Sequence, residues 1–267
     1  MPPPNTNIAA FNLTISTLLR NPSLLLPTLT IPTFLQLPED ELGRHLLHQP
    51  ASSLSPSPAS SSRYPTIRAL VIDKDNTLAP PHTTTLPPQY KQKLTALRTN
   101  PASPFNLSTN PGGILIVSNT AGSNPNSQRY EAEADKLEED LHDLKIRVFR
   151  SHRRKDSASL GGRGSVIKKP FSHRAVLDYL IEQGVVKGPD EVAIVGDRIG
   201  TDVLMAGLMG SWSVWVREGV RHDLSGEQGR DYRGVLAKAE RHLERYLRRR
   251  GVGPSIPTGW ERAGQNL

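Results

Sequence analysis

The sequence predicts an α/β fold with a single doubly wound parallel sheet, and two observations support this prediction. Five short apolar runs rich in β-branched residues have continuous apolar centres, as strands buried on both faces should. Segments with helical periodicity separate these runs, so that strand and helix alternate along the chain. The predicted strands are IRALVID (67–73), GILIVSN (113–119), IRVFRS (146–151), EVAIVGD (191–197) and SWSVWV (211–216).

The helical segments complete one domain over residues 67–250, followed by a C-terminal tail over 251–267. The predicted helices are PQYKQKLTALR (88–98), SQRYEAEADKLEEDLHDL (127–144), SHRAVLDYLIEQG (172–184), TDVLMAGLMG (201–210) and RDYRGVLAKAERHLERYLRRR (230–250). The last helix is amphipathic, because its apolar residues recur at helical spacing. Its predicted apolar side comprises Val235, Leu236, Ala239, Leu243 and Leu247.

The amino-acid composition limits the metal ions, nucleophiles and partners that the protein can use. The 267 residues include no Cys, which excludes disulfides, thiolate zinc sites and Cys nucleophiles. The remaining metal ligands are carboxylates and imidazoles, which favour hard cations. The formal net charge of +7 favours anionic partners, whether phosphate esters, nucleic acid or acidic lipid.

Residues 1–66 differ from the rest and are expected to form an N-terminal segment with a linker. Prolines interrupt the most apolar stretch, so that no run reaches the length of about 20 residues that spans a bilayer. Four apolar residues lie on one face of a short predicted helix: Phe11, Ile15, Leu18 and Leu19. This helix either lies in a membrane interface or packs onto the domain. The Ser/Pro-rich run ASSLSPSPASSSRYP (51–65) is typical of a flexible linker.

Polar residues gather where the predicted strands end. The strands lead into DKDNT (73–77), SNT (118–120) and GDRIGTD (196–202). Ligands of open α/β sheets bind at the carboxyl ends of the strands, so we expect these three loops to form one site.

Asp73 and Asp75 lie two residues apart just past a buried strand. Two carboxylates facing one crevice repel each other unless a cation neutralises them, and Mg²⁺ is the oxygen-seeking candidate. The alternative is a structural turn, because Asp and Asn are common after strands.

The order of the motifs along the chain favours a catalytic role for Asp73 and Asp75 over a purely structural turn. A strand followed by DKDNTL, then VSNT, then IKKP and then VGDRIGTD resembles the four motifs of the haloacid dehalogenase superfamily of phosphotransferases. The resemblance covers residues 67–216. It implies a Rossmann-like fold of that superfamily, a covalent aspartyl-phosphate intermediate and a Mg²⁺ cofactor.

On this resemblance three residues carry the chemistry. Asp73 is the expected nucleophile, which attacks phosphorus in line. Asp75 is the expected general acid and base. Lys169 precedes Pro170 as the motif lysine does, and it would neutralise both the nucleophile and the phosphate. Lys168 is the competing candidate, and either lysine could instead be a solvated surface residue.

The other motif residues would bind the phosphate or the metal. Ser118 and Asn119 would donate hydrogen bonds to phosphoryl oxygens. Thr77 would brace the phosphate-binding loop, although a local hydroxyl-to-backbone turn bond is equally consistent with its position. Asp197 is expected to complete the Mg²⁺ site with Asp73 and the backbone carbonyl of Asp75. Asp202 would hold the lysine or a metal-bound water, or act as a charge at a helix N-terminus.

No cap domain fits between the motifs, because the intervening segments hold little beyond single helices, one strand and loops. An uncovered site suits a substrate too large to enclose, such as a protein, a nucleic acid end or a lipid headgroup. Basic residues cluster nearby: Arg147, Arg150, Arg153, Arg154 and Lys155, with Arg248, Arg249 and Arg250 at the end of the last helix. An anionic bilayer attracts such clusters, whereas the alternative is a solvated run of charge.

A closer resemblance covers nearly the whole chain. The segment 12–38 followed by IRALVIDKDNTL, VSNTAG and VGDRIGTDVLMA resembles the fungal mitochondrial phosphatidylglycerophosphate phosphatase family. This implies release of the terminal phosphate of an anionic phospholipid to give phosphatidylglycerol, on the matrix face of the inner membrane by a peripheral protein, with no nucleic-acid partner. The insert RRKDSASLGGRGSV (153–166), which contains the Gly-rich run GGRGS (161–165), and the Ser/Pro linker depart from that family.

Two other classes of function stay open. A soluble protein or nucleotide phosphatase would use the same two carboxylates without needing the N-terminal helix or a lipid surface. A non-catalytic protein that binds anionic lipid or nucleic acid would tolerate Asp73→Asn, and the intact pair of aspartates argues against it.

Overall fold

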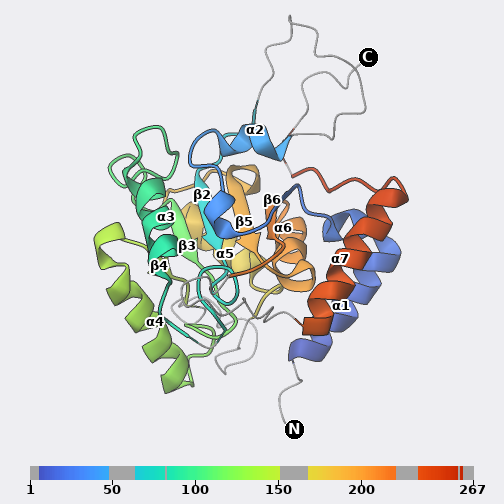
Figure 1. Ribbon diagram of the computed structural model, residues 1–267, viewed down its shortest axis with the longest axis horizontal. Helices are drawn as coiled ribbons and strands as arrows, with labels where there is room; N and C mark the ends of the chain where they lie inside the picture. Colours follow the sequence, from blue (N-terminus) through green and yellow to red (C-terminus); the bar gives the residue numbers. More distant parts are fainter. Residues whose placement is uncertain are drawn as a thin grey trace, which may run out of the picture.

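The computed structural model describes residues 6–47, 64–81, 83–150, 168–220, 234–257 and 259–260. These residues form one parallel sheet of six strands in the order β1-β6-β5-β2-β3-β4 (Figure 1). The strands are β1 (Leu29–Ile31), β2 (Ala69–Ile72), β3 (Ile114–Ile116), β4 (Arg147–Val148), β5 (Val192–Gly196) and β6 (Trp212–Val216). The predicted α/β fold with a single parallel sheet is therefore confirmed.

All five predicted strands pair within this sheet, and the sixth was not predicted. Leu29 lies beside Val214 and Ile31 beside Val216, so β1 forms the edge next to β6. Part of the segment before residue 67 thus belongs to the sheet itself rather than preceding the domain.

Six of the seven α-helices in the described residues lie where helical periodicity predicts them, and the short helix at Leu42–Leu46 was not predicted. The α-helices are α1 (Thr6–Arg20), α2 (Leu42–Leu46), α3 (Pro88–Thr99), α4 (Gln128–Asp140), α5 (His173–Glu182), α6 (Leu204–Met209) and α7 (Gly234–Arg249). Single 3₁₀ turns are η1 (Pro22–Leu25), η2 (Phe34–Gln36), η3 (His142–Leu144) and η6 (Pro189–Glu191), and the π-helical turn η7 (Ile199–Val203) runs directly into α6. The segment predicted as one helix over 201–210 therefore begins earlier, with a widened first turn.

Helices cover both faces of the sheet, and the two-residue period of the strands assigns each side chain to one face. Leu70 and Ile72 of β2 pack with buried residues of α2, α3 and α4. Ala69 and Val71 of the same strand pack against buried residues of α5 and α6. A strand buried on both sides has to be apolar throughout, which is why the run at 69–72 shows no alternation.

A third core cluster joins the two ends of the chain. Trp215 and Ile199 pack with Leu25 of η1 and Leu247 of α7, and partly buried leucines of α1 join them. Figure 1 shows α1 and α7 at the same edge of the molecule. The N-terminal helix therefore packs onto the domain with one face, which is one of the two roles expected for it.

The buried side of α7 differs from the predicted one. Val235, Leu236 and Ala239 are exposed, whereas Ala237, Glu240 and Leu247 are buried and Leu243 is partly buried. Residues 237, 240, 244 and 247 follow helical spacing along one stripe. The buried stripe is rotated from the most apolar side and includes an acidic residue, Glu240.

Several predicted features lie outside the described residues. These are most of the Ser/Pro linker at 51–65, the Gly-rich loop with GGRGS, and the basic residues Arg153, Arg154 and Lys155. Among the helices of the described segments, none has the length and apolar character required to cross a bilayer.

Candidate active site

The polar loops meet on three neighbouring strands. Asp73 follows β2, Asp197 follows β5 and Ser118 lies just past β3, and in the sheet β2 lies between the other two. The backbone N–H of Asp73 donates to the carbonyl of Val195 at 2.8 Å, which continues the strand pairing up to the carboxylate. Because parallel strands end at the same edge, side chains that are far apart in sequence come together here.

A compact turn follows Asp73. The N–H groups of Leu78 and Ala79 both donate to the carbonyl of Lys74 at 3.0 Å. Asn76 has φ 60°, in the left-handed region that Asn adopts more readily than most residues. The Asp/Asn-rich turn proposed as an alternative is therefore present, and it also holds the two carboxylates.

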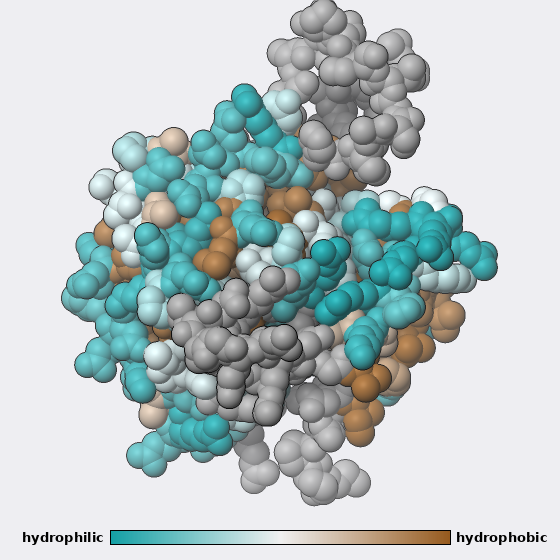
Figure 2. All heavy atoms as spheres, viewed as in Figure 1, coloured by the Kyte–Doolittle hydropathy of each residue, from teal (hydrophilic) through white to brown (hydrophobic). Residues whose placement is uncertain are grey.

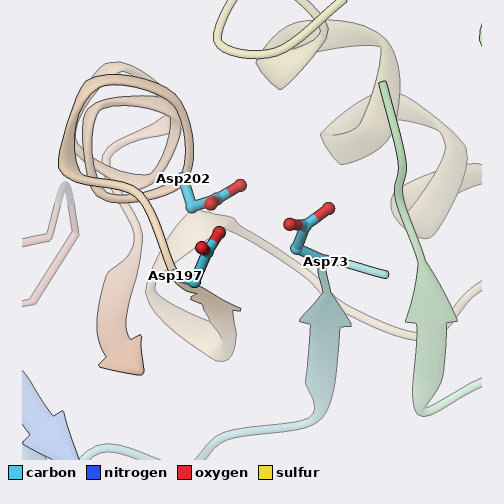
Figure 3. A group of neighbouring side chains, drawn as sticks. All are labelled: Asp73, Asp197 and Asp202. Atoms are coloured by element: carbon cyan, nitrogen blue, oxygen red, sulfur yellow. The ribbon is translucent and has the colours of Figure 1, made fainter. Parts of the chain in front are cut away.

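Three carboxylates surround one point. Asp73, Asp197 and Asp202 each offer an oxygen, and these oxygens lie within 4.8 Å of one another (Figure 3). The ammonium of Lys169 donates to Asp73 Oδ1 at 2.5 Å and to Asp202 Oδ1 at 2.7 Å. All four side chains are buried. A set of carboxylate oxygens at this spacing fits the ligand chemistry of a hard divalent cation such as Mg²⁺.

The electrostatics follow from burial and crowding. Burial raises the pKa of Asp73 well above its usual range, and Asp202, Asp197 and Asp75 act in the same direction while Lys169 opposes them. Burial alone would lower the pKa of Lys169, but the adjacent charges of Asp202 and Asp73 outweigh it and raise that pKa. Lys169 therefore stays charged, and the ionised form of Asp73 is disfavoured by its buried, acidic surroundings.

Lys169, and not Lys168, reaches the carboxylates. The backbone N–H of Lys169 donates to Asn119 Oδ1 at 2.8 Å, which ties the lysine to the loop after β3. Lys168 is half-buried, and in the described part of the chain its side chain is not among those that contact the three carboxylates. The side chain of Asn119 thus orients the lysine, a contact that was not predicted.

Asp202 uses both of its oxygens. Oδ1 accepts from Lys169, and Oδ2 accepts from the backbone N–H of Arg198 at 3.1 Å. Two of the roles expected for Asp202 have matching contacts: it holds the lysine, and it lies in the first turn of the helical segment that begins at Ile199. A Cβ on Gly196 would lie 2.2 Å from the carboxyl carbon of Asp202, so the strand end must be glycine for the two to approach. The carbonyl of Asp197 accepts from Trp215 Nε1 at 2.9 Å.

Asp75 lies beside this group and has its own neighbours. Its Oδ2 accepts from Thr120 Oγ1 at 3.2 Å and from Ser118 Oγ at 3.4 Å. Its Oδ1 lies 3.1 Å from the ammonium of Lys74. Sequence reasoning assigned no role to Thr120 or Lys74, and their place within SNT and DKDNT was the only signal for them.

Lys74 is completely buried. Its ammonium also donates to the carbonyl of Thr83 at 3.1 Å and lies 3.6 Å from Glu133 of α4. Thr77 is buried as well, and its hydroxyl has no hydrogen-bond partner among the described residues. The local turn bond suggested for Thr77 is therefore not formed within that part of the chain.

The surface candidates fall into three groups. Phe11, Ile15 and Leu19 are exposed on α1, whereas Leu18 is partly buried and packs against the third core cluster. Figure 2 shows apolar residues gathered at the edge formed by α1 and α7. Arg150 is buried and donates to Glu138 at 2.7 Å and to Asp135 at 2.6 Å, so its expected place in an exposed basic cluster is wrong.

The parallel sheet brings three carboxylates and a buried lysine to the ends of its central strands, where ligands of such sheets bind, and positioned charges of this kind fit the class of α/β phosphatases. Comparison with known sequences agrees with this class. The family described as mitochondrial PGP phosphatase matches residues 8–221. The chain therefore belongs to the mitochondrial PGP phosphatase family.

Individual relatives give the same result. The mitochondrial phosphatidylglycerophosphatase of Saccharomyces cerevisiae is 37% identical over 204 residues, which cover 76% of this chain and 84% of that protein. A mitochondrial protein of Schizosaccharomyces pombe, named a probable phosphatidylglycerophosphatase, is 28% identical over 76% of this chain and 78% of its own length. A solved structure of an uncharacterized protein from Listeria monocytogenes covers 67% of this chain and 99% of that protein's chain. Its identity is 15% and its TM-score 0.36, so the similarity is too weak to show a shared function.

Proposed function

We propose that the protein is a Mg²⁺-dependent phosphatase of the haloacid dehalogenase superfamily that removes the terminal phosphate of phosphatidylglycerophosphate to give phosphatidylglycerol. The observation that carries the proposal is the contact of the Lys169 ammonium with both Asp73 and Asp202 beside Asp197. Membership of the phosphatidylglycerophosphate phosphatase family, and the names of the two fungal relatives, support the substrate.

Asp73 is the proposed nucleophile. Its carboxylate oxygen bonds to phosphorus as the bond to the lipid oxygen breaks, and Asp75 gives that leaving oxygen a proton. Asp75 then takes a proton from a water, whose oxygen attacks the aspartyl phosphate, releases inorganic phosphate and restores Asp73. Lys169 keeps its positive charge throughout, so it offsets the charge of Asp73 and of the phosphoryl oxygens.

Mg²⁺ held by Asp73, Asp197 and the backbone carbonyl of Asp75 would supply charge neutralisation of the transferred phosphoryl group. The donor chemistry supports this, because carboxylate oxygens suit a hard cation. Asp202 holds Lys169 in this scheme. Ser118, Asn119 and Thr77 are the proposed phosphate-binding residues. The hydroxyl of Thr77, which has no hydrogen-bond partner among the described residues, remains available for that role.

The short segments between the strands of the site support a large substrate. In the described parts of the segments that join β2 to β3 and β3 to α5, the helices and strands are α3, α4, η3 and β4, too few for a separate cap. Phe11, Ile15 and Leu19 expose apolar surface on α1. The protein would therefore bind peripherally to a membrane and act on a lipid headgroup there. Both fungal relatives are named as mitochondrial, which supports a mitochondrial location, and we place the protein on the matrix side of the inner membrane.

The test is release of inorganic phosphate from phosphatidylglycerophosphate in liposomes with Mg²⁺, with Asp73→Asn as the inactive control. We expect release by the wild type, loss with Asp73→Asn, and loss on chelation of Mg²⁺. Turnover of soluble phosphate esters without release from the lipid would refute the lipid substrate and favour a soluble protein or nucleotide phosphatase. A wild type inactive on every ester would refute the enzyme and favour a binding protein.

A further inference from the structure

The loop that carries Asp202 begins with two backbone N–H groups at the first turn of a helix. Residues 199–209 form one continuous helical segment, the π-helical turn η7 followed by α6. The first N–H groups of any helix lack partners within the helix. Here the acceptor for two of these N–H groups comes from another helix. Glu240 Oε1 of α7 accepts from Ile199 N–H at 2.9 Å and from Gly200 N–H at 3.3 Å.

Glu240 is a buried acidic residue of α7. It is only 8% exposed, in a helix whose last turn ends in arginines. A carboxylate is costly to bury unless it accepts hydrogen bonds, and the two N–H groups provide them. Glu240 lies beyond residues 8–221, the part of the chain that the family comparison matches. The support for the Asp202 loop therefore comes from a helix outside the matched region.

The opposite side of the same turn is held by α1. Thr14 Oγ1 lies 3.5 Å from the carbonyl of Gly200, and a Cβ on Gly200 would lie 3.1 Å from that hydroxyl. Ile199 is completely buried in the third core cluster with Leu247 of α7. The turn between the two acidic residues is thus enclosed by both chain ends, and Glu240 makes the charged contact.

We propose that Glu240 is a positioning residue for the acidic site. By fixing Ile199 and Gly200, it holds the turn between Asp197 and Asp202 so that both carboxylates stay opposed to Asp73. The inference rests on the proposed function, since it assumes that these carboxylates bind a divalent cation. Without Glu240, the two N–H groups would turn toward water and the carboxylates would lose their fixed spacing.

The experiment compares Glu240→Ala, Glu240→Asp and Glu240→Gln in the full-length protein. Gln keeps an acceptor oxygen at the same reach, whereas Asp keeps the charge but is one methylene shorter. Glu244→Ala is the matched control, because Glu244 lies one turn further on α7 and pairs with Arg248. Binding of Mn²⁺ alone is followed by electron paramagnetic resonance on the folded protein, and kcat and KM are measured for a soluble phosphate ester.

We expect Glu240→Ala to weaken Mn²⁺ binding and lower kcat by about 10–100-fold, the range typical of residues that orient metal ligands, with little change in KM. Glu240→Gln should recover most of both values, and Glu244→Ala should match the wild type. If Glu240→Ala does not fold, Glu240→Asp decides, and it should weaken Mn²⁺ binding in a folded protein.

Wild-type Mn²⁺ affinity in a folded Glu240→Ala or Glu240→Asp protein would overturn the proposal, as would a drop in melting temperature with unchanged Mn²⁺ affinity. A wild type that binds no Mn²⁺ would overturn it as well. The outcome for the lipid substrate is separate. If the wild type binds Mn²⁺, the Glu240 variants lose it, and phosphatidylglycerophosphate is not hydrolysed, then the positioning role stands and the substrate assignment falls.

Discussion

Replacing Lys169 by Met tests whether the lysine neutralises the acidic site. Met has similar length but no charge, so the substitution leaves Asp73 and Asp202 without the ammonium that lies 2.5 and 2.7 Å from them. Removing one partner of a buried ion pair typically costs about 3–5 kcal/mol of unfolding free energy. For a chain of this size each kcal/mol corresponds to about 2–4 °C in melting temperature, so we expect a loss of about 6–20 °C.

The loss should depend on pH in a definite direction. The folded-state pKa of Lys169 is raised, so its stabilising contribution is complete below the unfolded pKa of a lysine and persists through neutral pH. The folded-state pKa of Asp73 is also raised, so the folded protein loses stability as the pH rises from the unfolded pKa of an aspartate to the folded one. Lys169→Met should therefore be least damaging near pH 5 and most damaging near pH 8.

Thermal unfolding in EDTA at pH 5 and pH 8, repeated with Mg²⁺, measures these effects. Lys168→Met is the matched control, since Lys168 is half-buried and away from the carboxylates, and we expect it to change stability by less than about 1 kcal/mol. Mg²⁺ should recover part of the loss at pH 8 because it replaces the missing positive charge. A Lys169→Met protein as stable as Lys168→Met at pH 8 in EDTA would refute the electrostatic role.

Three further variants test separate parts of the molecule. Asp73→Asn should abolish phosphate release yet stabilise the metal-free protein at pH 8 by about 1 kcal/mol. The reason is that the neutral side chain avoids the burial and carboxylate repulsion that raise the pKa of Asp73. A variant that is destabilised in thermal melts would contradict this. Phe11→Glu with Leu19→Glu should weaken sedimentation with anionic liposomes at least tenfold without altering turnover of a soluble ester, because both side chains are exposed; unchanged sedimentation would exclude this face of α1 as the lipid contact. Arg150→Met should lower unfolding free energy by about 3 kcal/mol in urea titrations and leave liposome binding unchanged, because Arg150 is bonded within the fold to Glu138; reduced lipid binding by the folded variant would restore it as a surface residue.

The central part of the fold could be predicted because its strands are buried on both faces. Continuous apolar runs such as Ala69–Ile72 are strong signals, and the polar loops that follow them must share one edge of the sheet. The position of Lys169 near Asp73 followed from motif order. The choice between Lys168 and Lys169 required the structure, because it depends on the Asn119 contact with the backbone of Lys169.

The edge strand β1 could not be predicted for a physical reason. It has three residues, lies between Pro27 and Pro32, and owes its existence to pairing with β6, whose partner residues lie 185 positions later in the chain. Lys74 is a similar case. Lysine is rarely buried, and its complete burial depends on Asp75 and on Glu133 of a distant helix, which no local pattern reveals.

The same reasoning explains the error in the buried side of α7 and what it means for the site. Hydrophobic periodicity selects the most apolar stripe of a helix, and for α7 that stripe includes Val235, which is 84% exposed. The helix instead turns Glu240 inward, which leaves apolar surface uncovered. Burying a carboxylate in place of available apolar residues costs stability unless its hydrogen bonds serve a need elsewhere. The N–H groups of Ile199 and Gly200 donate those hydrogen bonds, so Glu240 links the buried side of α7 to the turn that joins Asp197 to Asp202.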